Sequence, residues 1–288
     1  MTLRQLKRTF LSELDTIYPK TEIESFFYLL AETYLGLKRI DIALNIDDDI
    51  VIDNRFHNAL NELINHKPIQ YIIGSTEFFS LNFSVNKHVL IPRPETEELV
   101  DWIISDTKNK PYTKKIKILD IGTGSGCIAV SLAKNLPNAS IYAIDISKEA
   151  LKVAKENALN NDVIVTFIED DILNSTFNTK TLEPNLKFDI IVSNPPYVRE
   201  LEKKLMQNNV LNNEPHTALF VANDNALIFY DKIADFATNY LKPNGKIYFE
   251  INQYLGNETI ELLKNKGFTN IKLKKDIFNT DRMIKVIL

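Results

Sequence analysis

The sequence is poor in the residues that build disulfide frameworks and metal sites. It holds one cysteine, Cys127, and four histidines among 288 residues. One thiol can form neither an intrachain disulfide nor a multi-cysteine zinc site, and the histidines are scattered without ligand spacing. We therefore expect no metal ion, and a reducing, cytoplasmic setting is the default expectation.

Long apolar runs are absent as well. No stretch approaches the roughly 18 residues that indicate a membrane span, and the N-terminal MTLRQLKRTFLSELDTIY lacks the continuous apolar segment of a signal peptide. Apolar residues recur there at helical spacing instead, which predicts an amphipathic helix of a domain. These residues are Leu3, Leu6, Phe10, Leu14 and Ile17. We expect no association with a membrane.

The sequence also lacks an excess of positive charge. It carries 34 Lys and Arg against 38 Asp and Glu, a net charge of -4. A surface of this balance provides no broad attraction for phosphate backbones, so we expect no direct binding of nucleic acid. Apolar residues make up 44% and charged residues 25%, ordinary values for a globular protein with a substantial core.

Three regions differ in their residue pattern. Residues 1–74 carry helical periodicity and predict a small helical domain. Residues 75–92 alternate apolar and polar side chains around Asn86-Lys87, which predicts a β-hairpin or an extended connector. Strands alternate with helices from residue 93 to residue 288, a pattern typical of an α/β domain with a parallel sheet and right-handed crossovers.

Six or seven strands can be placed in the third region. They are 116–121, 140–144, 163–168, 188–193, 246–251, 268–275 and 282–288, and helical patterns lie between them at 127–135, 147–159, 225–241 and 256–266. About six residues separate the last two strands, too few for a helical crossover, so these strands should pair antiparallel. A doubly wound, Rossmann-like sheet ending in such a hairpin looks like the class I methyltransferase architecture.

A glycine-rich loop follows the first strand in ILDIGTGSGCIAVSLA. The loop consists of Gly122, Thr123, Gly124, Ser125 and Gly126. The dinucleotide fingerprint would need glycine or alanine at Cys127, so the loop reads G-x-G-x-G instead. Asp145 stands 23 residues after Gly122 at the end of the second strand, where a carboxylate can accept hydrogen bonds from ribose hydroxyls. The pattern favours a nucleoside ligand without a pyrophosphate.

Further acidic residues end other strands. Asp120 ends the first strand and could face a ligand ammonium group. After the third strand, Asp170 or Asp171 could accept from an adenine amine while Ile172 packs on the ring, although paired acids there can equally be solvated turn residues. Together with the glycine loop, Asp145 and Asn194, these residues outline a pocket for S-adenosyl-L-methionine, whose product after methyl transfer is S-adenosyl-L-homocysteine.

The fourth strand runs into Asn194-Pro195-Pro196-Tyr197. Pro195 restricts the backbone of Asn194, and the two prolines lack N–H groups, so the stretch is stiff and offers acceptors. A planar –NH2 group could donate to the Asn194 oxygen and to a main-chain carbonyl while Tyr197 stacks on its plane. Two acceptors would orient the nitrogen lone pair toward a methyl donor without a covalent intermediate. The residues leave a carboxamide and an adenine amine equally open.

Taken together, the motifs resemble the HemK/PrmC family of N5-glutamine methyltransferases. The stretches that carry the resemblance are KPIQYIIGSTEFF (67–79), VLIPRPETEELV (89–100), ILDIGTGSGCIAVSLA (118–133), AIDIS (143–147), DIIVSNPPYV (189–198) and EPHTAL (214–219). The resemblance implies methylation of the glutamine in the Gly-Gly-Gln motif of class 1 peptide-chain release factors, which tunes translation termination. It implies that Asn194 to Tyr197 bind the glutamine amide, that the helical domain helps to dock the release factor, and that the enzyme is monomeric.

Three stretches depart from the family pattern, namely Ser80, FVANDNAL (220–227) and EINQYLG (250–256). We expect them to lie outside the core chemistry. Three other functions stay open: a glutamine methyltransferase of a ribosomal protein, an adenine N6 methyltransferase of RNA or DNA, and an inactive cofactor-binding module for protein interactions. The acidic balance disfavours the second function, and the intact glycine loop, Asp145 and residues 194–197 disfavour the third.

Overall fold

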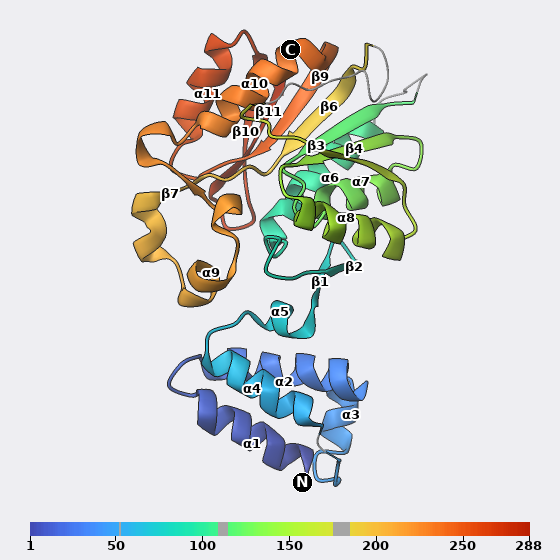
Figure 1. Ribbon diagram of the computed structural model, residues 1–288, viewed down its shortest axis with the longest axis vertical. Helices are drawn as coiled ribbons and strands as arrows, with labels where there is room; N and C mark the ends of the chain where they lie inside the picture. The colour runs from blue at the N-terminus through green and yellow to red at the C-terminus, as the bar shows by residue number, and fades with distance from the viewer. Residues whose placement is uncertain (52, 109–114, 175–184) are drawn as a thin grey trace. The chain divides into compact units, whose positions relative to one another are not determined.

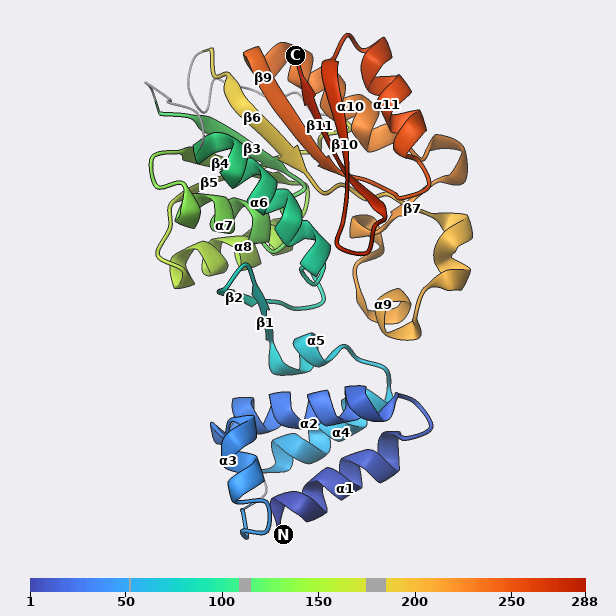
Figure 2. The ribbon, with the colours of Figure 1, turned by 180° about the vertical axis from the view of Figure 1, so that it is seen from behind.

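The computed structural model describes residues 1–51, 53–108, 115–174 and 185–288, and the chain forms two compact units (Figures 1 and 2). The first unit comprises Met1–Gly74 together with Gln207–Asn213, and the second comprises Ser75–Met206 together with Glu214–Leu288. The short segment 207–213 therefore belongs to the helical unit although it lies far along the chain. The side chain of Asn213 donates a hydrogen bond to the carbonyl of His66, 3.0 Å away.

The first unit is helical. Its helices are α1 (Leu3–Leu14), α2 (Lys20–Leu35), α3 (Arg39–Leu44), α4 (Asn54–Ile64), α5 (Ile69–Ile73) and α9 (Asn208–Asn213). The predicted apolar stripe of α1 is buried at Leu3, Leu6, Phe10 and Leu14, which confirms the amphipathic helix. The ring of Phe10 meets Phe27 and Phe56 edge-on, with centroids 6.1 and 6.5 Å apart, so one aromatic cluster joins α1, α2 and α4.

A β-hairpin opens the second unit. Strands β1 (Ser75–Phe78) and β2 (Leu81–Ser84) pair antiparallel, and Phe79 and Ser80 form the two-residue turn. Both turn residues have positive φ angles, 51° and 59°, as a tight hairpin turn of this twist requires. The turn expected around Asn86-Lys87 was therefore wrong. Phe79-Ser80 carries none of the glycine or asparagine that normally marks such a turn.

The second unit is built on a seven-stranded sheet. Its strands are β3 (Lys117–Ile121), β4 (Ser140–Asp145), β5 (Val165–Glu169), β6 (Phe188–Ser193), β9 (Leu241–Glu250), β10 (Thr269–Lys275) and β11 (Asp281–Ile287). The order is β10-β11-β9-β6-β3-β4-β5, and β11 alone runs antiparallel to its neighbours. The predicted antiparallel pairing of the last two strands is confirmed. β11 also lies between β9 and β10 in the sheet. The number of residues between the last two strands does not determine this order.

Helices cover both faces of this sheet (Figure 1). Helices α6 (Pro94–Lys108), α7 (Cys127–Asn135) and α8 (Lys148–Asn160) contribute to the core on one face, and α10 (Ile228–Tyr240) and α11 (Gly256–Asn265) to the core on the other. Adjacent strand residues point to opposite faces, as Ile118 and Leu119 do. Helix α6 was not predicted, although Pro94 at its first position and Glu95 and Glu97 in its first turn are typical of a helix start.

Short elements complete the second unit. They are β7 (Val198–Arg199), β8 (Phe220–Val221) and the 3-10 helices η2 (Glu200–Leu205), η3 (His216–Ala218) and η4 (Asn223–Asn225). Strand β7 pairs in parallel with β8, so the chain directly after Tyr197 lies beside the divergent stretch 220–227. Across the described ranges, no helix combines the length and apolar character that a membrane crossing needs.

Candidate active site

The glycine loop joins β3 to α7 through a backbone with three left-handed positions. Gly122, Gly124 and Gly126 have φ angles of 75°, 54° and 80°, which side chains with a Cβ rarely adopt. The amides of Gly122 and Thr123 both donate to the carbonyl of Ile144, at 2.9 and 3.0 Å, and so attach the loop to the end of β4. Apart from the adjoining residues of the loop, no atom of the described chain lies within 4 Å of the Cβ position of Gly122 or Gly124, so this side of the loop is open to a ligand.

The third glycine has a second structural role. A Cβ at Gly126 would lie 3.0 Å from the Cβ and 3.2 Å from the Cα of Ala154 on α8. Glycine therefore lets the first turn of α7 approach α8. The result is a fixed position for the loop relative to the two helices behind it.

Asp145 meets the glycine loop across the ends of two neighbouring strands. Its Oδ2 accepts a hydrogen bond from the amide of Gly124 at 2.8 Å, and its Oδ1 accepts one from the amide of Ser147 at 2.9 Å. Each oxygen keeps a lone pair for a ribose hydroxyl. Burial raises the pKa of Asp145, and these backbone amides oppose the rise. The structure thus brings the predicted loop and the predicted acid together.

Asp120 is a buried carboxylate with one unsatisfied oxygen. Its side chain has no exposed surface, and Oδ2 accepts a hydrogen bond from the hydroxyl of Thr123 at 2.6 Å. Among the described residues, none supplies a hydrogen bond to Oδ1. Burial raises the pKa of Asp120 to about 7, and the nearby charge of Asp145 adds to the rise. A buried acceptor without a partner is costly, and a ligand ammonium group would satisfy it.

The residues after β5 are engaged in their own turn. Asp171 accepts hydrogen bonds from the amide of Leu173 at 2.9 Å and from the side chain of Asn174 at 2.8 Å. Ile172 packs partly buried against the core under α10 and α11, and the amide of Asp170 donates to the carbonyl of Asp145 at 3.2 Å. Asp171 therefore has the structural role in a turn that the sequence analysis gave as the alternative to adenine binding. Recognition of adenine by this segment stays a prediction.

Residues 194–197 rest on a buried hydrogen-bond chain. The side-chain nitrogen of Asn194 donates to the Thr96 hydroxyl at 3.2 Å, and that hydroxyl donates to Oε2 of Glu250 at 2.6 Å. The hydroxyl of Tyr197 donates to Oε1 of Glu250 at 2.9 Å. Thr96 and Glu250 are 2% and 1% exposed. Burial raises the pKa of Glu250, while the two hydroxyls and the charge of Arg282 lower it.

The main chain of the tetrapeptide presents free acceptors. The carbonyl of Tyr197 accepts from the side chain of Asn252 at 2.9 Å, and Asn252 also donates to Glu202 at 2.9 Å. Within the described part of the chain, no hydrogen bond reaches the carbonyl of Pro195 or Pro196. Within the described residues, these two carbonyls and the side-chain oxygen of Asn194 therefore remain unused as acceptors, with Pro195 buried and Asn194 and Pro196 half-buried.

Thr96, Glu250 and Asn252 were missed as site residues. The stretch 250–256 was expected to lie outside the core chemistry, and the contacts of Glu250 and Asn252 with Tyr197 correct that expectation. A signal was present, because Glu250 is a charged residue at the end of the apolar strand KIYFE, the same pattern that singled out Asp120. The side chain of Tyr197 was expected to stack on the substrate, and that stacking stays a prediction.

Two other quoted motifs meet at a partly buried ion pair. The guanidinium of Arg93, in stretch 89–100, donates to Glu214, in EPHTAL, at 2.6 Å. The second oxygen of Glu214 accepts from the amide of Ile91 at 3.2 Å, and Glu214 is 4% exposed. The pair joins segments 121 residues apart and supports the chain that leads into α6.

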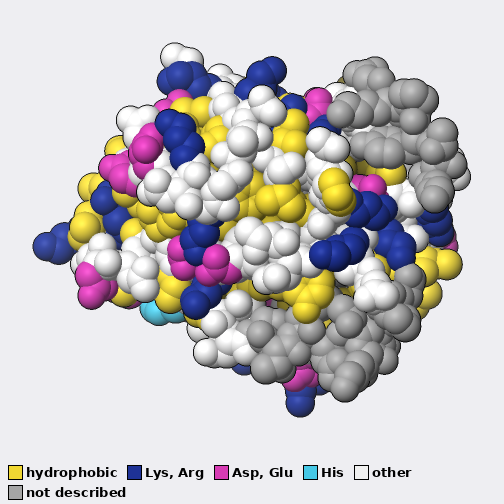
Figure 3. Space-filling view, turned by 90° about the horizontal axis from the view of Figure 1, so that it is seen from above, with side chains coloured by type: hydrophobic (Ala, Val, Ile, Leu, Met, Phe, Trp, Pro, Cys, Tyr) yellow, Lys and Arg dark blue, Asp and Glu magenta, His cyan; other side chains and the backbone are white. Residues whose placement is uncertain are grey.

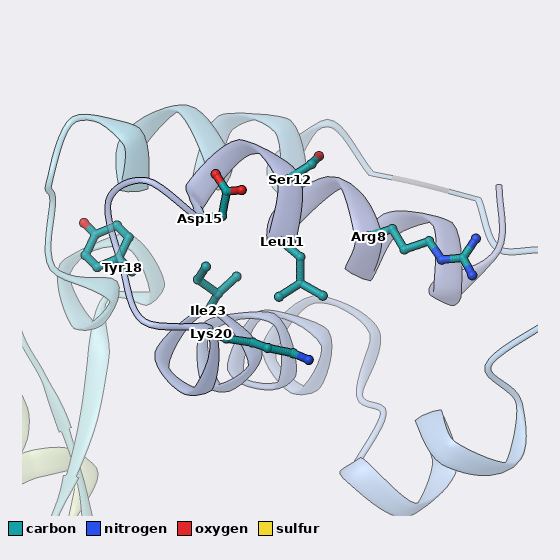
Figure 4. A pocket seen from close by; sticks show the side chains of 7 residues that line it. All are labelled: Arg8, Leu11, Ser12, Asp15, Tyr18, Lys20 and Ile23. Atoms are coloured by element: carbon teal, nitrogen blue, oxygen red, sulfur yellow. The ribbon is translucent and has the colours of Figure 1, made fainter.

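A separate hollow lies in the first unit (Figure 4). It has a volume of about 420 Å³ and is lined by Arg8, Leu11, Ser12, Asp15, Tyr18, Lys20 and Ile23. Its charged side chains are exposed, and no predicted site residue lines it. Over the residues that the structure covers, no cluster of three or more histidine, cysteine or acidic side chains has the arrangement of a metal site.

Comparison with known proteins agrees with this geometry. A family model described as a methyltransferase domain matches residues 112–272. A methyltransferase structure from Pyrococcus furiosus is 19% identical, covers 80% of this chain and 98% of its own, and superposes with a TM-score of 0.51. This likeness shows a shared fold, and the predicted class I methyltransferase sheet is confirmed.

Curated relatives extend the match to both units. A release factor glutamine methyltransferase of Flavobacterium psychrophilum is 54% identical over 290 aligned positions, which cover 99% of both chains. A second, from Bacteroides thetaiotaomicron, is 43% identical and covers 94% of this chain and 95% of its own. The matched span, 99% of this chain for the first relative, takes in the glycine loop, residues 194–197 and the helical unit. This chain therefore belongs to the family of release factor glutamine methyltransferases.

Proposed function

We propose that this enzyme transfers a methyl group from S-adenosyl-L-methionine to the side-chain amide nitrogen of a glutamine, within the Gly-Gly-Gln motif of class 1 peptide-chain release factors. The observation that carries the proposal is the set of unused acceptors at Asn194, Pro195 and Pro196, which follow β6, the strand paired with β3 before the glycine loop. A carboxamide offers two N–H hydrogens in one plane, which such a set can accept.

The cofactor residues of this chain fit S-adenosyl-L-methionine. The open side of Gly122 and Gly124 would admit it, Asp145 would accept from its ribose, and the unsatisfied oxygen of Asp120 would accept from its ammonium group. When bound, the cofactor supplies a methyl group on a positively charged sulfur. Thr123 and Ser125 complete the loop, and Asp171 and Ile172 remain candidates for the adenine end.

Residues 194–197 would act on the substrate by orientation and electrostatics. A carboxamide nitrogen is a poor nucleophile because its lone pair is delocalised into the carbonyl. Acceptors on both hydrogens hold the nitrogen in place and stabilise the positive charge that develops on it during transfer, and one of these hydrogens then leaves the nitrogen as a proton to solvent. The carboxylate of Glu250 behind Asn194 and Tyr197 adds negative charge on the same side.

The release factor is favoured over the alternatives by the relatives that the chain matches. Two of them carry the release factor in their names, and they match both units of this chain. An adenine substrate in nucleic acid would require a basic surface, whereas Figure 3 shows lysine and arginine side chains interspersed with acidic ones on the face in view. We further propose that the helical unit docks the factor, and that the enzyme is a cytoplasmic monomer.

The test is transfer of labelled methyl to three purified acceptors in parallel: a class 1 release factor, ribosomal protein and an adenine-containing oligonucleotide. We expect label on the release factor alone, at the glutamine of Gly-Gly-Gln when the site is mapped by mass spectrometry. A factor with alanine in place of that glutamine is the matched control. Label on the oligonucleotide alone, or none on any acceptor while cofactor binds, would refute the proposed substrate.

A further inference from the structure

The two ends of the Asn194 side chain have opposite hydrogen-bonding character. Oδ1 accepts hydrogen bonds and Nδ2 donates them, while the two ends have nearly the same shape. The chemistry that residue 194 offers to a substrate therefore depends on which end faces it. The side-chain amide of a surface asparagine rotates freely between its two orientations, so a fixed orientation needs a structural cause.

The cause lies in the number of hydrogens on the Thr96 hydroxyl. It has one, and that hydrogen is donated to Oε2 of Glu250 at 2.6 Å. Toward Asn194 the hydroxyl can then only accept, so it takes a hydrogen from Nδ2, 3.2 Å away. Turning the amide over would place Oδ1 against a lone pair of the hydroxyl. Oδ1 is thereby directed away from Thr96.

We propose that Thr96 and Glu250 are positioning residues, which fix the acceptor end of Asn194 toward the substrate and so select a carboxamide over a carboxylate. This inference rests on the proposed function for its substrate. It adds that the preference for glutamine over glutamate originates outside the tetrapeptide, in two side chains that are 2% and 1% exposed.

Other contacts fix the position of each residue in this chain of hydrogen bonds. Thr96 sits in the first turn of α6, where its amide donates to the carbonyl of Arg93 at 3.0 Å. Glu250 ends β9 in register with Met283 of β11, and the hydroxyl of Tyr230 donates to its carbonyl at 3.1 Å. Tyr197 occupies the second carboxylate oxygen of Glu250. While Glu250 is ionised, both of its oxygens accept, and the polarity of the hydrogen-bond chain has one arrangement.

The consequence for selectivity follows from simple pairing. A glutamine amide donates to the oxygen of Asn194, whereas a glutamate carboxylate has no hydrogen to donate and would face that oxygen with its own lone pairs. Without the Thr96 hydroxyl, Asn194 can turn over and offer Nδ2, a donor that a carboxylate accepts. Loss of Thr96 should therefore reduce turnover of glutamine and improve binding of glutamate.

The variants Thr96→Val and Thr96→Ser separate this role from packing. Valine preserves the shape of threonine and removes the hydroxyl, and serine keeps the hydroxyl and removes a methyl group. We expect kcat with the release factor to fall about 10- to 100-fold in Thr96→Val, as for loss of one hydrogen bond to a charged group, and to stay within about threefold in Thr96→Ser. Melting temperature and cofactor Kd serve as folding controls.

The decisive readout is a ratio of dissociation constants. Kd is measured for the release factor and for its Gly-Gly-Glu variant, with S-adenosyl-L-homocysteine bound. The preference for glutamine should shrink at least about fivefold in Thr96→Val and persist in Thr96→Ser. An unchanged ratio with unchanged kcat in Thr96→Val would overturn the inference. A ratio is independent of the fraction of folded protein, so a destabilised variant still gives an answer.

A second measurement needs no substrate. Neutron diffraction from a deuterated crystal distinguishes nitrogen from oxygen and locates the deuterium atoms of Asn194. We expect the –ND2 group to face Thr96, and the Thr96 deuterium to face Glu250. Finding Oδ1 against Thr96 would overturn the inference even if the release factor is methylated. Absence of methylation with the expected orientation would instead count against the proposed function alone.

Discussion

The buried side-chain nitrogen of Asn157 on α8 donates a hydrogen bond to the carbonyl of Ser125 in the glycine loop, 2.9 Å away. The same nitrogen donates to the carbonyl of Ser84 at 3.0 Å, and Oδ1 accepts from the amide of Ser84 at 2.6 Å. Asn157 has no exposed surface. One side chain thus connects the candidate cofactor loop to the end of the β1–β2 hairpin.

Replacing Asn157 by alanine should destabilise the second unit and weaken cofactor binding together. The change leaves three backbone groups without a partner, for which we expect a loss of about 2–4 kcal/mol in the free energy of unfolding. Urea denaturation and cofactor Kd measure the two effects. Asn160→Ala, at an exposed position of the same helix, is the matched control. Equal stability of the two variants would contradict a structural role for these bonds.

Asn194→Ala should bind cofactor normally and lose catalysis. Removing the proposed acceptor should cost about 2–4 kcal/mol of transition-state stabilisation, seen as a lower kcat with labelled methyl and release factor. Asn265→Ala, at an exposed position of α11, is the matched control, and its kcat should equal that of the unaltered enzyme. Turnover at the rate of the unaltered enzyme would rule out Asn194 as the clamp.

Asp120→Asn should weaken cofactor binding in a pH-dependent way. The folded-state pKa is about 7, above the ordinary value of 3.8, so the free carboxyl is charged above pH 7 and protonated below it. Binding of a cationic group requires the charged form, so Kd of the unaltered enzyme should rise as pH falls from about 7.5 to about 6. In Asp120→Asn we expect Kd about 10- to 100-fold higher near pH 7.5, with a flatter pH profile. Calorimetry at several pH values tests this, and parallel profiles would exclude Asp120 as the cation's partner.

Ser80→Gly should stabilise the enzyme. Ser80 has a φ of 59° in the hairpin turn, a conformation that costs residues with a Cβ about 1–2 kcal/mol, and part of that is offset by the larger chain entropy of unfolded glycine. We expect a net gain of about 0.5–1 kcal/mol in urea denaturation. Ser80→Val, which places a branched side chain in the same conformation, should lose stability. Shifts of the same sign in both variants would show that backbone strain at residue 80 is not the cause.

Sequence patterns predicted the elements whose signals are local. The strand before Gly122, the helix from Cys127 to Asn135 and strand 188–193 were placed within a residue because apolar periodicity and glycine mark them within a short window. The hairpin turn failed because Phe79-Ser80 carries no turn residue, and its positive φ values are imposed by the pairing of β1 with β2. Strand β9 begins at Leu241, before the predicted 246, because pairing with β6 extends it through a polar stretch.

The sequence by itself determined the chemistry on offer: a glycine loop that admits a ligand, an acid one strand away, and a stiff run of acceptors at Asn194 to Tyr197. These are properties of residue type and close spacing, which survive without any knowledge of distant contacts. Only the tertiary structure decided the orientation of these side chains and backbone groups. Thr96, Asn194 and Glu250 are up to 154 residues apart in the sequence. The direction of the Asn194 amide follows from the hydrogen bond that the Thr96 hydroxyl donates to Glu250, and this bond forms only once α6 and β9 have packed together.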